Sequence, residues 1–109
     1  MDKFQNYIDP MSKKLKELEK EGFNDQFKFI QDKGLQSTSS HETYQPGDLQ
    51  IIDEFRFEGE SNPSDMSILY AIRAKDGTKG TLVNAYGTYA DDELGEFIKS
   101  VEDKSNENL

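Results

Sequence analysis

The fold is decided between Leu49 and Gly87, where the sequence reads LQIIDEFRFEGESNPSDMSILYAIRAKDGTKGTLVNAYG. Three runs rich in β-branched and aromatic residues follow one another here, separated by the polar segment Gly59–Asp65 and by Asp76-Gly77. The runs are Leu49–Glu58, Met66–Ala74 and Lys79–Tyr86. Apolar and polar positions alternate within them, so the stretch predicts three consecutive antiparallel strands.

The hairpin at Asp76-Gly77 decides which residues face each other across the sheet. A two-residue turn would pair Tyr70 with Val83, whereas a three-residue loop would pair Tyr70 with Leu82. The second alternative places Gly77 in the left-handed conformation and gathers the large side chains on one face. We therefore favour the three-residue loop.

The odd positions of the first strand form its apolar side, and one of them is charged. We expect Leu49, Ile51, Phe55 and Phe57 to face the core, with Asp53 between them. A carboxylate on an otherwise apolar face has to be paired, hydrogen-bonded or near the rim.

Two amphipathic helices flank these strands. The first begins at Asp9-Pro10, where an N-cap acceptor precedes a proline, and ends near Glu21. Gly22 then suits the left-handed position that commonly ends a helix. The second helix covers about Asp92–Val101 and follows Asp91 as its N-cap, with apolar residues at i, i+3, i+4 and i+7.

These elements predict an α+β fold. Phe27–Gln31 alternates as a strand, and Leu35–Ser39 forms an edge strand at most. We expect an antiparallel sheet of four to five strands with the N-terminal and the C-terminal helix packed on one face. Residues 9–101 form the single domain, 1–8 are an N-terminal segment with a short turn or no regular structure, and 102–109 are a disordered tail.

Composition and charge narrow the function classes. The chain has no cysteine, which excludes disulfides and thiolate chemistry. Its formal net charge is −9, and residues 42–65 hold seven acidic side chains against one basic. We expect no nucleic-acid partner and no membrane partner, since both carry negative charge. The acidity either serves solubility or indicates a cation or an unknown protein partner of basic character. The absence of an apolar signal segment predicts a cytoplasmic protein.

The best candidate site is the end of the sheet where the loop after the first strand meets the end of the third. In a meander these segments are neighbours, so polar and aromatic residues from both can converge. The ligand-binding candidates are Glu58, Asn62, Asp65, Asn84 and Tyr86. Asn84 is the most informative, because an amide within an apolar strand requires a hydrogen-bond partner from the protein or from a ligand. The alternative is a loop whose polar side chains stabilise its own turns.

No motif predicts a catalytic residue, a cofactor or a metal ion. The single histidine, His41, lies in a polar loop without companions for nucleophilic catalysis. The adjacent acids Asp91-Asp92 are explained by helix capping as well as by a magnesium-phosphate site.

Several segments resemble a family of small bacterial proteins that often carry the label phosphoribosylpyrophosphate synthetase. They are FRFEG at residues 55–59, SNP at 61–63, SILYAI at 67–72 and LVNAYG at 82–87. The resemblance spans roughly residues 13 to 101. It implies binding of, or catalysis on, phosphorylated sugars or nucleotides.

Two functions therefore remain open, besides a mainly structural role as an accessory in a larger complex. The first is a small non-enzymatic domain for binding or interaction, which uses an acidic face or an exposed strand edge. The alternative is a small ligand-binding or catalytic protein for phosphorylated sugars or nucleotides, as the resemblance implies.

Overall fold

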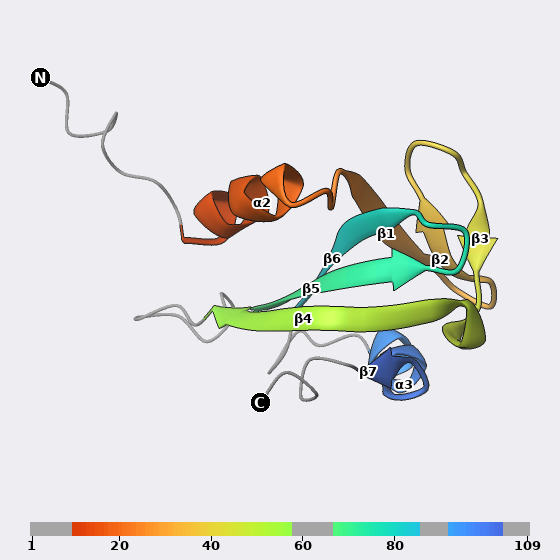
Figure 1. Cartoon of the computed structure of the whole chain (residues 1–109). Coiled ribbons are helices and arrows are strands. Elements are labelled where there is room, and N and C mark those ends of the chain that lie inside the picture. The colour runs from red at the N-terminus through yellow and green to blue at the C-terminus, as the bar shows by residue number, and fades with distance from the viewer. Residues whose placement is uncertain (1–9, 58–66, 86–91, 104–109) are drawn as a thin grey trace, which may run out of the picture.

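The computed structural model describes residues 10–57, 67–85 and 92–103, and these have an α+β fold (Figure 1). Within these ranges seven strands form one mixed sheet in the order β3-β2-β1-β6-β5-β4-β7. The elements are α2 (Pro10–Lys20), β1 (Asp25–Ile30), β2 (Gly34–Ser37), β3 (Thr43–Tyr44), the 3₁₀ turn η1 (Pro46–Asp48), β4 (Leu49–Phe57), β5 (Ser67–Ala74), β6 (Lys79–Ala85), α3 (Asp92–Lys99) and β7 (Glu102–Asp103).

Strands β4, β5 and β6 form the antiparallel meander that the sequence predicts. Tyr70 of β5 faces Leu82 of β6, which is the register of the three-residue loop. Gly77 in this loop has a φ of +94°, and its N–H donates a hydrogen bond of 3.0 Å to the Ala74 carbonyl. The favoured hairpin is therefore confirmed.

The sheet is larger than predicted, and it is not purely antiparallel. β1 pairs in parallel with β6, and β7 pairs in parallel with β4. Gly80 allows the first contact, because a Cβ at this position would lie 2.6 Å from the backbone oxygen of Asp25. The predicted antiparallel sheet of four to five strands was therefore wrong. The parallel pairings were missed because each joins only two residues per strand and leaves no pattern in the sequence.

Strand β2 lies inside the sheet rather than at its edge. It pairs with β1 on one side and with β3 on the other, so the predicted edge strand was misplaced. Tyr44 of β3 lies opposite Leu35, which is fully buried. The Tyr44 ring also packs edge-on against Phe27 with 5.9 Å between ring centroids. Tyr44 thus covers the outer side of β2.

The two helices pack on opposite faces of the sheet, which contradicts the predicted arrangement on one face (Figure 1). Alternate residues of β5 divide between two cores. Leu69 and Ala71 pack with Leu18 of α2, whereas Tyr70 and Ile72 belong to the cluster that contains Leu94 of α3. Because successive side chains of a strand point to opposite faces, each helix covers its own side.

A β-bulge in β4 explains why the sequence pattern was misleading. Ile51 faces Ile72, but Asp53 faces Ala71, so Ile52 is the extra residue and the side-chain alternation reverses. Ile51 therefore points to the α3 side, whereas Phe55 packs on the α2 side. The odd positions do not share one core.

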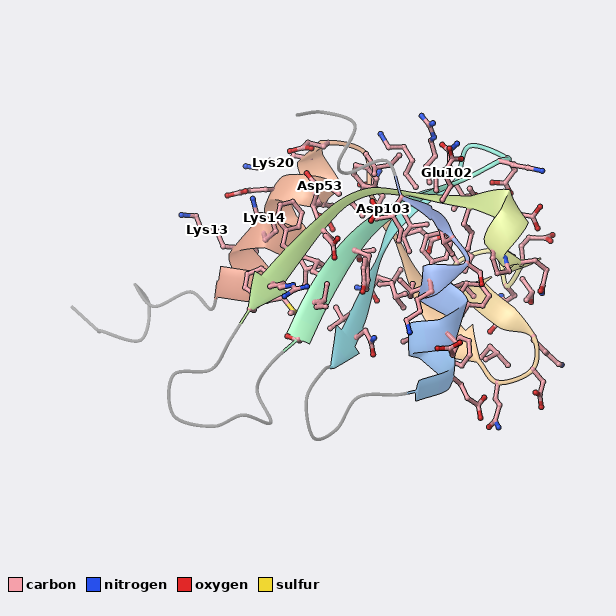
Figure 2. The ribbon with its side chains drawn as sticks, turned by 90° about the horizontal axis from the view of Figure 1, so that it is seen from below. Lys13, Lys14, Lys20, Asp53, Glu102 and Asp103 are labelled. Carbon is pink, nitrogen blue, oxygen red and sulfur yellow. The ribbon has the colours of Figure 1, made fainter. Side chains whose placement is uncertain are left out.

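Asp53 comes directly after this bulge, is exposed, and lies on the α2 side of the sheet (Figure 2). The hydrogen bond of Glu17 is the main reason why the pKa of Lys14 is raised, and the charge of Asp53 contributes to the same shift. The bulge thus moves the one charged odd position to an exposed place beside a lysine.

Helix α2 ends as predicted, at a glycine with a positive φ. Gly22 has a φ of +102°, its N–H bonds to the Glu19 carbonyl at 3.1 Å, and the Phe23 N–H bonds to the Leu18 carbonyl at 3.0 Å. This is a Schellman motif, in which the residue after the glycine makes an apolar contact with the last turn. Phe23 and Leu18 are both buried in the same cluster.

Two residues of the predicted C-terminal tail belong to the sheet. The sequence placed a disordered tail at 102–109, and the structure has Glu102 and Asp103 in β7. The two predicted N-caps, Asp9 and Asp91, lie outside the described residues. So do the rest of residues 1–9 and residues 104–109.

Candidate functional site

The register brings together the strand ends at which the sequence predicts a site. Phe57 pairs with Ser67, and Ser67 pairs with Ala85, so β4 ends, β5 begins and β6 ends at one end of the sheet. Asn84 lies at this end, half-buried and opposite Ile68. The other four candidates lie outside the described residues, and they are Glu58, Asn62, Asp65 and Tyr86.

Asn84 lies on the α3 side of the sheet. Leu82, two positions earlier on the same strand, belongs to the core on this side. No hydrogen bond joins the Asn84 side-chain amide to another described residue. The predicted site thus contributes one half-buried amide to the described part of the chain, and the convergence of the five residues stays a prediction.

A pocket of about 480 Å³ lies where the turn between β1 and β2 meets α3. We call it the α3 pocket. Its lining residues are Phe29, Asp32, Lys33 and Gly34 of the turn region, Gln45 after β3, and Glu93, Glu96 and Phe97 of α3. The volume falls within the range of about 300–1,000 Å³ that is typical of small-molecule sites. Figure 2 views the molecule from the side on which α3 lies.

The floor of the α3 pocket is aromatic. Phe29 and Phe97 are half-buried, and their rings meet edge-on with 5.7 Å between centroids and an interplanar angle of 66°. The rings come from elements far apart in the sequence, and both pack against the α3-side core. The floor is therefore held by tertiary packing and not by a single loop.

The two walls are held close together. Gln31 Nε2 donates a hydrogen bond of 2.9 Å to Glu93 Oε1 and so ties the turn to α3. Gly34 is buried between the walls with a φ of +118°, and a Cβ there would lie 3.3 Å from Cε2 of Phe97. Gln45 Nε2 donates to the Lys33 carbonyl across the turn. The narrow approach of the walls thus depends on a residue without a side chain.

The rim of the α3 pocket is acidic. Asp32, Glu93 and Glu96 are exposed, and among the described lining residues the one basic side chain is Lys33. Lys99 pairs with Glu96 at 3.2 Å, but both of these side chains are 76% exposed, so water screens the pair strongly. Three carboxylates above two aromatic rings favour a ligand that joins an apolar body to a positive charge.

A second pocket of about 480 Å³ lies between η1, the β5–β6 hairpin and β7. Two of its charged side chains, Arg73 and Glu102, bind the amide of Gln50 between them. Arg73 Nη2 donates to Gln50 Oε1 at 2.7 Å, and Gln50 Nε2 donates to Glu102 Oε1 at 3.0 Å. The described residues that line this pocket include no aromatic ring and hold charges of both signs, so the second pocket is the weaker candidate.

A cluster of hydroxyl groups surrounds Asp25 at the start of β1, and the sequence analysis did not anticipate it. Ser37 is fully buried and donates to the Asp25 carboxylate, as does Ser39 at 3.0 Å. Ser37 Oγ also accepts the N–H groups of Ser39 at 3.2 Å and Ser40 at 3.0 Å. Burial alone would raise the pKa of Asp25, but the hydrogen bonds together hold it below its usual value. All these groups have partners, so the role of the cluster is structural.

Other chemistry has little support in the part of the chain that the structure describes. There, no group of three or more histidine, cysteine, aspartate or glutamate side chains is arranged to hold a metal ion. His41 is exposed and has a φ of +66°, and its N–H donates to the Ser37 carbonyl at 2.9 Å. Among the helices of the described ranges, none has the length and the apolar character needed to cross a membrane.

Comparison with known proteins adds no further constraint on the site: no family model, no curated protein and no solved structure matches the chain.

Sequence reasoning placed the residues of the α3 pocket in separate elements and did not combine them. Phe29 belonged to the predicted strand Phe27–Gln31 and Phe97 to the apolar positions of the predicted helix Asp92–Val101, and Asp32, Lys33 and Gly34 follow that strand in the sequence. One signal was present. A glycine directly after a charged turn often marks a close approach of two segments, but the sequence does not say which segment approaches.

Proposed function

We propose that this protein is a non-enzymatic binding domain whose recognition site is the α3 pocket. Its ligand carries a positive charge beside an apolar or aromatic group. The observation that supports this proposal is the combination of a Phe29–Phe97 floor with an acidic rim of Asp32, Glu93 and Glu96.

The charge of the whole chain supports the same function. With a formal net charge of −9, the protein attracts cations over a distance and repels anions. At the α3 pocket the local balance has the same sign, with three acidic side chains against Lys33. Long-range attraction and local contacts therefore favour the same class of ligand.

The exposure of the rim supports binding over catalysis. Catalytic carboxylates are usually desolvated or forced against a like charge, which tunes them for proton transfer. Glu93, Glu96 and Asp32 are exposed instead. Solvated carboxylates of this kind suit the attraction of a cation better than the transfer of a proton.

The alternative is a ligand of phosphorylated sugar or nucleotide type, as the family resemblance implies. A phosphate group would meet the carboxylates of Asp32, Glu93 and Glu96 at the α3 pocket, where Lys33 is the one basic side chain among the lining residues that the structure describes. This alternative would therefore need a different site, and the predicted residues around Asn84 are the place to look for it.

A pair of indole compounds tests the proposal. Tryptamine and indole-3-propionate share the aromatic body but carry opposite charges, and the chain has no tryptophan, so the indole fluorescence belongs to the ligand alone. We expect tryptamine anisotropy to rise with protein concentration and indole-3-propionate anisotropy to stay near its free value. Equal binding of both compounds, or of neither, would contradict the proposal.

Amide chemical shifts locate the binding and include the alternative. Tryptamine should shift the amides of residues 29–34 and 93–97, whereas phosphoribosyl diphosphate with Mg²⁺ should leave these unchanged. Shifts at Asn84 with the phosphorylated compound, and none with tryptamine, would favour the alternative function instead.

Matched variants separate local from overall charge. The first double variant, Glu93→Gln with Glu96→Gln, removes two acidic charges from the rim. The second, Glu19→Gln with Glu21→Gln, removes two exposed acidic charges at the C-terminal end of α2, on the other face of the sheet. We expect the first pair of substitutions to weaken tryptamine binding by roughly threefold to tenfold and the second pair to change it by less than about twofold. Similar effects of the two pairs would show that the α3 pocket is not the site.

A further inference from the structure

The arrangement of α3 narrows the kind of cation that fits the α3 pocket. Glu93, Glu96 and Phe97 are related by i, i+3 and i+4, so two carboxylates and one ring lie on the same face of the helix. All three line the pocket, and the ring of Phe29 completes the floor. A cation seated here meets flat apolar surface and paired carboxylates together.

A guanidinium group matches this combination better than an ammonium group. It is planar, it stacks on aromatic rings, it is weakly hydrated, and its fork of N–H donors fits carboxylates. An ammonium group is a compact and strongly hydrated charge, which gains less from the aromatic floor.

The protein itself uses cations over aromatic rings on the opposite face of the sheet. Lys14 Nζ lies 4.6 Å from the centroid of the Phe55 ring, and Lys79 Nζ lies 4.5 Å from that of Phe23. Among the described residues, no lysine or arginine lies over Phe29 or Phe97, whose rings contact each other. Within the described ranges, the rings of the α3 pocket are thus available to an external cation.

The charge of the rim also indicates the source of the guanidinium. Free arginine carries an α-carboxylate, which the acidic side chains of Asp32, Glu93 and Glu96 repel, and an α-ammonium group, which they attract, so its α-charges add little net attraction. An arginine within a peptide chain carries neither of these hydrated charges, and its neutral backbone can lie at the mouth of a pocket that opens widely to solvent. We propose, on the basis of the function proposed above, that the α3 pocket binds an arginine side chain presented by a segment of a partner protein.

Blocked tripeptides provide the test. Acetyl-Gly-Xaa-Gly-amide is titrated against the full chain with arginine, lysine or citrulline at the central position, and free arginine is the fourth ligand. Amide shifts of residues 29–34 and 93–97 report the binding. We expect the arginine peptide to bind roughly twofold to fivefold more tightly than the lysine peptide. The citrulline peptide should bind more weakly than either, and free arginine should bind more weakly than the arginine peptide.

A substitution in the floor separates recognition from simple charge attraction. Phe97→Leu keeps the acidic rim but removes one ring, so the arginine and lysine peptides should bind this variant with about equal affinity. Phe55→Leu on the α2 side is the matched control and should retain the preference. A retained preference in Phe97→Leu, with the fold verified from the dispersion of the amide shifts, would overturn the proposal.

The outcomes distinguish this proposal from the function on which it rests. If tryptamine binds but the lysine peptide binds as tightly as the arginine peptide, the arginine assignment is wrong and the proposed function stands. If free arginine binds as tightly as the blocked peptide, the partner segment is wrong. If tryptamine does not bind either, both proposals are wrong.

Discussion

Replacing Gly34 with alanine should destabilise the protein more than the same change at other glycines. Gly34 has a φ of +118°, a conformation that costs an L-residue about 1–2 kcal/mol. The new Cβ would also overlap the Tyr44 carbonyl oxygen and lie 3.1 Å from Nε2 of Gln45. Overpacking of this kind costs about 1–3 kcal/mol. The two terms together predict a loss of about 2–5 kcal/mol in the free energy of unfolding.

Three further glycines separate the two terms. Gly77 has a φ of +94°, and no heavy atom lies within 4 Å of the place that a Cβ would take, so Gly77→Ala should cost only the conformational term. Gly80 meets the Asp25 backbone at 2.6 Å without a positive φ, so Gly80→Ala should cost only the steric term. Gly47 has neither feature, and Gly47→Ala should change stability by less than about 0.5 kcal/mol.

Urea unfolding followed by far-ultraviolet circular dichroism measures all four variants on one scale. The reasoning predicts that the loss for Gly34→Ala is close to the losses for Gly77→Ala and Gly80→Ala added together. A loss for Gly34→Ala below that of Gly77→Ala would refute it, because the walls of the α3 pocket would then have room for a side chain.

Three other predictions follow from the packing and the charges. Leu18→Ala should lower the free energy of unfolding by about 2–5 kcal/mol, and Ile72→Val should lower it by about 0.5–1.5 kcal/mol. In the double variant the two losses should add within about 0.5 kcal/mol, because the residues belong to cores on opposite faces of the sheet. Non-additive losses in urea unfolding of the three variants would indicate that the helices share one core. Ser37→Ala should cost about 1–3 kcal/mol near neutral pH. Hydrogen bonds keep the pKa of folded Asp25 below its unfolded value, so this stabilisation is present above about pH 4 and is lost as the pH falls further. The difference in the free energy of unfolding between wild type and Ser37→Ala should therefore decrease in acid. A difference that does not change with pH would show that Asp25 is not involved. Lys99→Gln removes the cation that lies 3.2 Å from the Glu96 carboxylate, so it should raise the affinity for tryptamine by up to about twofold. An unchanged or lower affinity in the anisotropy titration would argue against an acidic recognition site.

Local features of the fold were predictable from the sequence, because their causes are local. Asp76-Gly77 between apolar runs predicted the hairpin, and the left-handed Gly77 fixed its register. Gly22 predicted the end of α2, where the Schellman hydrogen bonds depend on neighbouring residues alone. The three strands of the meander followed from their alternating pattern.

The arrangement of the layers was not predictable, because one residue reverses it. The bulge at Ile52 moves Phe55 and Phe57 to the α2 side while Leu49 and Ile51 remain on the α3 side. A strictly alternating pattern hides such an insertion, so the sequence indicated one apolar face where the sheet has two. The parallel contact between β1 and β6 was equally hidden, since it joins only two residues on each strand.

The α3 pocket could not be predicted, because its parts come from distant segments. Phe29 and Phe97 meet only after the β1–β2 turn has packed beside the last helix, and the Gln31–Glu93 hydrogen bond spans 62 positions of the chain. The predicted site around Asn84 rested instead on strand ends that neighbouring sequence segments define. Asn84 is the one of its five residues that lies in the described part of the chain.

The most direct test of the α3 pocket is to measure nuclear Overhauser effects between unlabelled tryptamine and the isotope-labelled protein. We predict contacts from the indole protons to the ring protons of Phe29 and Phe97, and from the aminoethyl protons to the side chains of Glu93 and Glu96. Contacts to Leu49 or Ala74 of the second pocket, in place of these, would contradict the assignment of the recognition site.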